Sequence, residues 1–183
     1  MAFLSKDHIK SMGFQSIGEN VLLSDKASYY NCKNIAIGNN TRTDDFTVLS
    51  AGEGGIEIGQ YVHIAIGVSV IGSGKILIKN FLGLSSKVSV YSSNDDYSGE
   101  FMTNPTVPDS FINVSHGVVS IGRHVIVGSG SVILPNVTLG AIGALSLVTK
   151  NCSEFGVYIG SPAKKIKERS RNLLSLESQL MNK

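Results

Sequence analysis

The feature that most constrains the fold is a six-residue period between residues 121 and 148. Ile121, Val127, Ile133 and Leu139 follow one another at this spacing, and a glycine comes directly after the first two. A step of six matches neither the helical period near 3.6 nor plain strand alternation. It is the hexapeptide repeat of a parallel β-helix, in which each repeat supplies one short strand and a corner. Successive coils then cover one another's apolar interior.

The same step runs through most of the chain. A charged content of only 16%, together with 20 glycines, suits stacked short strands with tight corners. The 183 residues are expected to form one domain. After the turn-rich run at 51–55, the predicted inward residues are Ile58, Ile64, Val70, Ile76, Leu84 and Val90. A less regular form of the same repeat precedes them, with inward residues predicted at Ile17, Leu23, Tyr29, Ile37, Thr43 and Leu49.

The β-helix is expected to occupy residues 14–160, with one cap before it and one interruption inside it. Residues 1–13 form the cap, in which Ser5 is a good N-cap for a short helix over residues 5–12. A cap is needed because an open coil exposes strand edges. Residues 91–118 break the period completely, and a long excursion from a regular scaffold is usually functional.

The C-terminal segment, residues 161–183, is expected to be an α-helix. Ser161-Pro162 has the form of an N-cap followed by proline at the first helical position. The following charged residues are interrupted by an apolar stripe, which is predicted to pack against the β-helix or a neighbouring subunit. The stripe consists of Ile166, Leu173, Leu176 and Leu180.

Besides a two-residue shift through Ile78, between Ile76 and Leu84, the period slips at Gly140-Ala141. The inward residue after Leu139 should stand at position 145, yet Ile142 and Val148 are better inward candidates and lie six residues apart. Three positions are therefore missing from this coil. We expect a tightened or skipped corner at this point.

Charge and cysteine content exclude several classes of protein. A formal net charge of +2 is too small to indicate a nucleic-acid partner. Cys32 and Cys152 are isolated, so they are interpreted as free thiols in a reducing compartment. The N-terminal residues lack the apolar core of a signal peptide, and no run reaches the roughly 18 apolar residues of a membrane span. The chain is therefore expected to be cytoplasmic and to have no membrane partner.

Three motifs occur in order near the C-terminal end: IGRHVIVGSGSVILPNVTLG at 121–140, IGALSLVTK at 142–150 and YIGSPAKKIKERS at 158–170. Together they resemble the C-terminal half of the hexapeptide-repeat acyltransferases. The resemblance implies a left-handed β-helix, a homotrimer and acetyl-CoA as the acyl donor. A small residue at 144 would let pantetheine approach backbone amides, and lysines would meet the phosphates as point charges. The positions that match donor contacts in the family are Ser129, Ala144, Thr149, Lys150, Lys164 and Lys167.

The excursion loop departs from one pattern of this family. Many of its sugar O-acetyltransferases use a loop histidine as general base, whereas this chain has Asn94-Asp95-Asp96-Tyr97 at the matching place. Histidine, with a pKa near 6.5, suits a hydroxyl acceptor at neutral pH, and a carboxylate near 4 does not. A carboxylate can instead bind an ammonium group and take its proton as the new bond forms. The substitution therefore favours N-acylation.

The loop also resembles that of N-acetyltransferases acting on nucleotide-linked amino sugars, in particular the type that uses dTDP-4-amino-4,6-dideoxyglucose. This resemblance implies a nucleotide-linked amino sugar as acceptor and a role in O-antigen or capsule synthesis. We expect Asp95 to be the catalytic base or amine anchor. Ser85 and Asp96 are the expected substrate-binding residues, and Asp96 is also the rival candidate for the base.

Three alternatives stay open. His116, just before the repeat resumes, is a candidate base for a sugar O-acetyltransferase. A metal hydratase on the same scaffold needs three gathered histidines, but His116 and His124 lack a suitably spaced third, so no metal is expected. A non-catalytic solenoid is disfavoured by the acidic loop. His63 and His124 are interpreted as structural.

Overall fold

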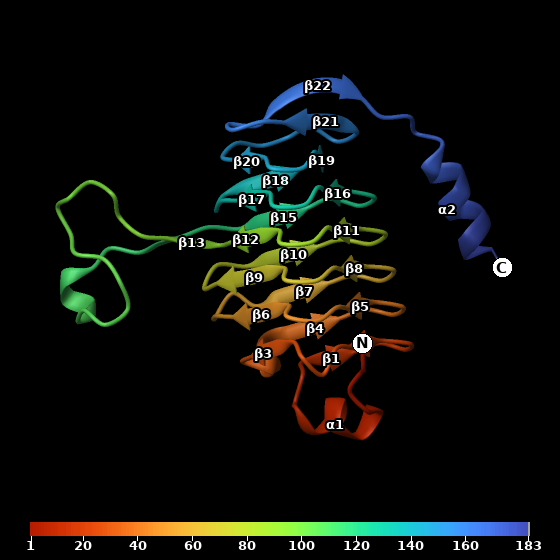
Figure 1. Cartoon of the computed structure of the whole chain (residues 1–183), viewed down its shortest axis with the longest axis horizontal. Helices are drawn as coiled ribbons and strands as arrows, with labels where there is room; N and C mark the ends of the chain where they lie inside the picture. Colours follow the sequence, from red (N-terminus) through yellow and green to blue (C-terminus); the bar gives the residue numbers. More distant parts are fainter. Residues whose placement is uncertain (183) are drawn as a thin grey trace.

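The computed structural model describes residues 1–182 and consists of short coils stacked into a prism (Figure 1). Three sheets of parallel strands form the sides of the prism, which confirms the all-β parallel β-helix. The first sheet contains β1 (Ser16–Ile17), β4 (Ile35–Ile37), β7 (Ile56–Ile58), β10 (Ile76–Ile78), β15 (Val119–Ile121) and β18 (Val137–Leu139). The second contains β2 (Leu22–Leu23), β5 (Arg42–Thr43), β8 (His63–Ile64), β11 (Gly83–Leu84), β16 (Ile126–Val127), β19 (Ala141–Ile142), β21 (Gly156–Ile159) and an added antiparallel strand, β22 (Lys164–Glu168). The third contains β3 (Ser28–Tyr30), β6 (Val48–Ala51), β9 (Ser69–Gly72), β12 (Ser89–Tyr91), β17 (Val132–Ile133) and β20 (Leu147–Val148).

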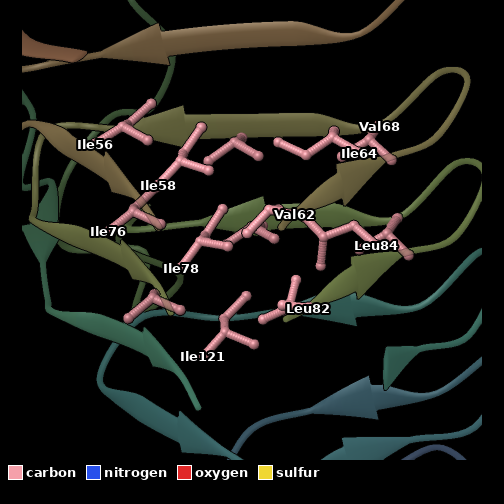
Figure 2. Close-up of a cluster of buried hydrophobic side chains, with 14 of the residues drawn as sticks. Ile56, Ile58, Val62, Ile64, Val68, Ile76, Ile78, Leu82, Leu84 and Ile121 are labelled. Atoms are coloured by element: carbon pink, nitrogen blue, oxygen red, sulfur yellow. The ribbon is translucent and has the colours of Figure 1, made fainter. Parts of the chain in front are cut away.

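Aliphatic side chains fill the interior of the prism from coil to coil, as Figure 2 shows for its middle part. On the first sheet, Ile37, Ile58, Ile78, Ile121 and Leu139 are register partners in successive coils, and none is more than 4% exposed. Full burial of one such side chain contributes about 1.5–3 kcal/mol. All six inward residues predicted between 58 and 90 are buried. The hexapeptide period therefore predicted the core correctly.

The first coil is less completely covered. Ile17 and Tyr29 are half-buried, because this coil has a neighbour on one side only. Helix α1 (Lys6–Ser11) lies across the open end and contributes Ile9, which is 6% exposed. Ser5 Oγ accepts a hydrogen bond from the backbone N of His8 at 3.2 Å, so the predicted N-cap is confirmed. A short 3₁₀ helix, η1 (Cys32–Asn34), stands at the corner between β3 and β4.

The excursion loop leaves the prism between β12 and β15 and projects from its side (Figure 1). Its neck is a two-stranded antiparallel ladder of β13 (Ser93–Asn94) and β14 (Ser115–His116). A short 3₁₀ helix, η2 (Asp109–Phe111), lies in its outer part. The predicted interruption is therefore an ordered arm with a paired base.

The prediction of one continuous helix from residue 161 is wrong. Residues 164–168 form β22, which pairs antiparallel with β21, and helix α2 spans only Leu173–Met181. Ser161 is not a helix N-cap, since Ser161-Pro162 lies in the turn between the two strands. The physical reason is that β21 ends the second sheet, and its open edge needs a covering strand. A run of lysine and glutamate suits an exposed edge strand as well as a helix.

The apolar stripe proposed for this segment is largely uncovered within one chain. Ile166, Leu176 and Leu180 are 54%, 57% and 44% exposed. Helix α2 is instead attached through Glu177, which lies 3.2 Å from Arg123 Nη1 and 2.6 Å from His124 Nε2. Among residues 1–182, no helix has both the length and the apolar character needed to cross a membrane.

The slip of the period at Gly140-Ala141 is a shortened corner, as predicted. Leu139 pairs with Ile121 in the first sheet, and Ile142 already pairs with Val127 in the second. Both Ile142 and Val148 are buried, which confirms the predicted register. A cavity of about 240 Å³ opens beside this corner, and its lining includes Gly140, Phe155, Arg169 and Leu174.

Candidate active site

Two expected donor contacts, Ser129 and Ala144, lie in successive coils at the corner between the second and third sheets. The backbone N of Leu145 donates to Ser129 O at 2.9 Å, and the backbone N of Gly128 donates to Ile142 O at 2.8 Å. A Cβ on Gly128 would stand 2.6 Å from Ala144 Cα, so the two coils can approach this closely only because residue 128 is glycine. Both Ser129 and Ala144 are exposed. They form a narrow strip of small residues, which we call the donor wall.

Lys164 lies close to the donor wall and Lys167 further along the same strand. In β22, Lys164 pairs with Ile159 and Lys167 with Val157. Gly143, beside Ala144, packs so closely against Ile159 that a Cβ at position 143 would clash with Ile159 Cγ2. Both lysines are exposed. Lys165, between them, forms an ion pair with Glu168, and hydrogen bonding to Glu168 raises the pKa of this lysine.

Thr149 and Lys150 stand apart from the donor wall. They follow β20, so the length of that strand separates them from Ala144. Both are exposed. Within one chain, the six expected donor residues therefore form two groups at different corners of the prism.

Ser85 is positioned one coil before the donor wall, at the same corner. Its backbone N donates to Val127 O at 2.9 Å, and the backbone N of Gly130 donates to Ser86 O at 3.0 Å. Ser85 is half-buried. Ser85, the expected substrate residue, and the first coil of the donor wall are therefore about one strand spacing apart, roughly 5 Å.

The two aspartates of the loop differ sharply. Asp96 Oδ1 accepts from the backbone N of Ser98 at 2.7 Å, and Asp96 Oδ2 accepts from Asn113 Nδ2 at 2.7 Å. Hydrogen bonds from Ser98 and then Asn113 hold the pKa of Asp96 below its ordinary value. Asp96 thus fastens one limb of the arm to the other. Asp95 is exposed, and within residues 1–182 its carboxylate has no hydrogen-bond partner, so it remains available to a substrate.

Ser85 and Asp95 do not meet within one chain. Ser85 follows β11, whereas Asp95 follows β13 after the full length of β12. Figure 1 shows the arm projecting away from the side on which β11 and β16 lie. The structure therefore brings Ser85 to the donor wall and directs Asp95 outward, away from both.

The histidines have clear partners. His116 Nδ1 lies 2.8 Å from Ser93 Oγ, which also accepts from the backbone N of Ser73 at 2.8 Å, so His116 belongs to the neck of the arm. His124 stacks on Phe81 with ring centroids 5.1 Å apart and contacts Glu177. Among the described residues, no group of three or more His, Cys, Asp or Glu side chains is arranged to hold a metal ion.

Sequence reasoning missed a polar cluster around Asp44 on the second sheet. Asp44 is 7% exposed, its Oδ1 lies 2.6 Å from Arg42 Nε, and its Oδ2 lies 2.9 Å from His63 Nε2. Burial acts to raise the pKa of Asp44, but the hydrogen bonds and charges of His63 and Arg42 outweigh it and hold that pKa below its ordinary value. From the sequence His63 is interpreted as structural, and no pattern singles out Arg42 or Asp44. Their proximity depends on the length of each coil, which the sequence pattern alone does not fix here.

Comparison with known proteins bears on the fold and on the class of enzyme. No family model matches the chain. The chain is 56% identical over 181 residues to the dTDP-4-amino-4,6-dideoxy-D-glucose acyltransferase of Escherichia coli, covering 97% of this chain and 94% of that protein. The chain belongs to this acyltransferase family. Its predicted fold and enzyme class are thereby confirmed.

Several solved structures have the same architecture. A variant of AntD, an N-acyltransferase from Bacillus cereus solved with dTDP and coenzyme A, has a TM-score of 0.94 and 40% identity, covering 100% of this chain and 99% of that one. AntD solved with dTDP and 3-hydroxybutyryl-CoA has a TM-score of 0.93 and 41% identity, covering 98% and 96%. A maltose O-acetyltransferase from Clostridium difficile 630, at 22% identity and a TM-score of 0.61, covers 91% and 75% and shares the fold.

Proposed function

We propose that this acyltransferase transfers an acetyl group from acetyl-CoA to the amino group of a nucleotide-linked 4-amino-4,6-dideoxy sugar, with dTDP as the nucleotide. The relative from Escherichia coli and the complexes of AntD support the substrate class and the CoA donor. The observation that carries the proposal is the position of Ser85 one coil before the donor wall, combined with a free carboxylate, Asp95, in place of a loop histidine.

Asp95 and Ser85 have distinct roles in the proposed reaction. Asp95 binds the substrate ammonium and accepts its proton, and the amine lone pair then attacks the thioester carbonyl. The carbon–sulfur bond breaks as the amide forms, and the thiolate leaves as coenzyme A after taking up a proton. Ser85 orients the amine by a hydrogen bond. AntD structures include variants of one serine and of one aspartate ten positions further along, the spacing that separates Ser85 from Asp95, which supports this pair.

The separation of Ser85 and Asp95 in one chain supports a shared site between copies. We propose a homotrimer in which the arm of one subunit carries Asp95 to Ser85 and the donor wall of the next. Ser129 and Ala144 would line the pantetheine, and Thr149, at a different corner of the prism, would contact another part of the donor. Lys150, Lys164 and Lys167 would meet the phosphates of the donor. The enzyme is proposed to act in the cytoplasm, in the synthesis of lipopolysaccharide O-antigen or capsule.

The test compares Asp95→Asn with His116→Asn. Purified variants are mixed with acetyl-CoA and dTDP-4-amino-4,6-dideoxyglucose, and free thiol release is followed. Asp95→Asn is expected to lower kcat by about 10²–10⁴-fold, the usual contribution of a general base. His116→Asn is expected to retain most activity on the amine. Near-normal turnover of Asp95→Asn would show that the assignment is wrong.

A further inference from the structure

The outer face of the second sheet presents a row of residues next to Ser85 that the proposed reaction does not yet use. Arg42, His63, Gly83 and Ile126 are register partners in four successive coils. The side chains of Arg42 and His63 are 45% and 53% exposed, and Ile126 is 52% exposed. Gly83 stands in the middle of the row, and a Cβ at this position would meet nothing within 4 Å. The row is basic in its first two coils, bare in the third and apolar in the fourth.

Asp44 fixes the two basic side chains without using all their donors. Its carboxylate accepts hydrogen bonds from Arg42 Nε and His63 Nε2. Arg42 Nη2 lies 3.4 Å from Met1 Sδ, and the Phe3 ring lies 5.5 Å from the guanidinium carbon, so this side chain is held on several sides. Arg42 Nη1 and His63 Nδ1 have no hydrogen-bond partner within residues 1–182. Arg42 Nη1 can donate to a phosphate oxygen directly, and His63 Nδ1 can do so when the imidazole is protonated, because Nε2 keeps its own proton toward Asp44.

The nearby carboxylates leave the outward-facing nitrogens of Arg42 and His63 unoccupied. Both oxygens of Asp44 are already engaged by Arg42 and His63. Asp45, the next residue, accepts from Ser24 Oγ at 2.5 Å and lies 3.9 Å from Lys26 Nζ. Asp44 therefore balances the charge of Arg42 and Asp45 that of Lys26, but within residues 1–182 neither carboxylate contacts Arg42 Nη1 or His63 Nδ1. A guanidinium presenting free N–H groups is well suited to phosphate.

The spacing of the row fits one class of ligand. Successive strands lie about 4.8 Å apart, so Arg42 is roughly 10 Å and His63 roughly 5 Å from Gly83. Ser85 lies two residues beyond Gly83, at the corner that leads to the donor wall. A sugar ring lying on bare backbone at Gly83 would thus have a phosphate group one to two coils away on one side and the acyl acceptor position on the other.

We propose that Arg42 and His63 bind the diphosphate of the nucleotide sugar, while Gly83 leaves the space in which the sugar ring lies. This inference rests on the proposed function. It assigns the direction in which the nucleotide sugar lies along the second sheet, with the diphosphate at Arg42 and His63 and the sugar ring at Gly83. Asp44 is a positioning residue that orients both basic side chains. Ile126 forms the apolar upper edge of the same surface.

The test uses dTDP as the probe, so it does not depend on turnover. His63→Gln and Arg42→Gln each keep an N–H donor toward Asp44, which protects the buried carboxylate from losing its partner. Gly83→Val adds volume where the structure has open space. Lys75→Gln, which removes a surface cation paired with Glu57 at 2.6 Å, is the matched control on another part of the molecule. Calorimetry measures dTDP binding, melting curves verify folding, and steady-state assays give KM for nucleotide sugar and acetyl-CoA separately.

The expected pattern separates the two parts of the substrate. Arg42→Gln and His63→Gln weaken dTDP binding about tenfold or more, as expected when a hydrogen bond to a charged group is lost. Gly83→Val leaves dTDP binding unchanged and raises KM for the nucleotide sugar at least about tenfold. The KM for acetyl-CoA stays constant in all variants, and Lys75→Gln behaves as wild type.

Either of two results would overturn the inference: wild-type dTDP affinity in folded Arg42→Gln and His63→Gln, or an unchanged KM for the nucleotide sugar in Gly83→Val. Failure of wild-type protein to bind dTDP would overturn it as well. Failure of the proposed function is recognised differently. In that case wild-type enzyme releases no thiol with any amino-sugar nucleotide, whatever the variants do to dTDP binding.

Discussion

Gly128 affects both the stacking of two coils and the position of the donor wall, because it packs against the backbone of Gly143 and Ala144. A Cβ added there would lie 2.6 Å from Ala144 Cα and 2.6 Å from the carbonyl carbon of Gly143, about 0.8 Å closer than ordinary contact at 3.4 Å. The opposing atoms are backbone, so no side chain can rotate away. In Gly128→Ala the two coils must therefore separate, and the 2.8 Å hydrogen bond from Gly128 N to Ile142 O lengthens.

Overpacking of this kind costs about 1–3 kcal/mol. For a chain of 150–250 residues, each kcal/mol lowers Tm by about 2–4 °C, so Gly128→Ala is expected to lose about 2–12 °C in a thermal melt. The shift of Ala144 also raises KM for acetyl-CoA more than KM for the nucleotide sugar. Gly83→Ala is the matched control, because it makes the same chemical change in the adjacent coil with nothing within 4 Å of the new Cβ. Equal melting temperatures and equal acetyl-CoA KM values for the two variants would refute the steric reasoning.

Two further outcomes concern the arm and the C-terminal helix. Because the pKa of Asp96 is lowered in the folded protein, its bonds to Ser98 and Asn113 persist below the ordinary carboxyl pKa of about 3.9 and are lost as pH falls through the lowered value. An NMR titration in which the Asn113 side-chain amide moves with a midpoint at or above 3.9 would contradict this. Glu177→Gln weakens the contacts with Arg123 and His124 by about 1 kcal/mol and is expected to speed hydrogen exchange in α2, whereas α1 exchanges as before. Unchanged exchange in α2 would show that this helix is held by other contacts.

The sequence predicted the body of the fold well because a β-helix is a local structure. Each coil places an aliphatic residue inward at a fixed step, so Ile58, Ile64 and Val70 can be assigned without knowing any distant contact. The shortened corner at Gly140-Ala141 was visible for the same reason, as a break in the step. The C-terminal segment was predicted wrongly because nothing in KKIKE distinguishes an edge strand from a helix. Its structure is decided by the open edge of β21.

The site was only partly visible in the sequence. Ser129, Ala144 and Ser85 were found through family motifs, and the structure places them at one corner. Asp95 was found as a departure from the family pattern, but its distance from Ser85 depends on how the arm leaves the prism. The cluster of Arg42, Asp44 and His63 was missed, since its members come from two coils and neither a local motif nor a family motif marks them.

The reversal of chain direction at β22 also sets the number of coils. Because β22 runs antiparallel to β21, the second sheet offers no parallel template on which another hexapeptide coil can grow, and α1 closes the opposite end. A lengthened version of this protein must therefore gain coils in the interior. Coils inserted between β5 and β8 would move Arg42 away from Gly83, whereas coils inserted between β3 and β4 would leave that spacing intact. Repeat insertion would therefore preserve the spacing of Arg42 and Gly83 in one region of the solenoid and disrupt it in another.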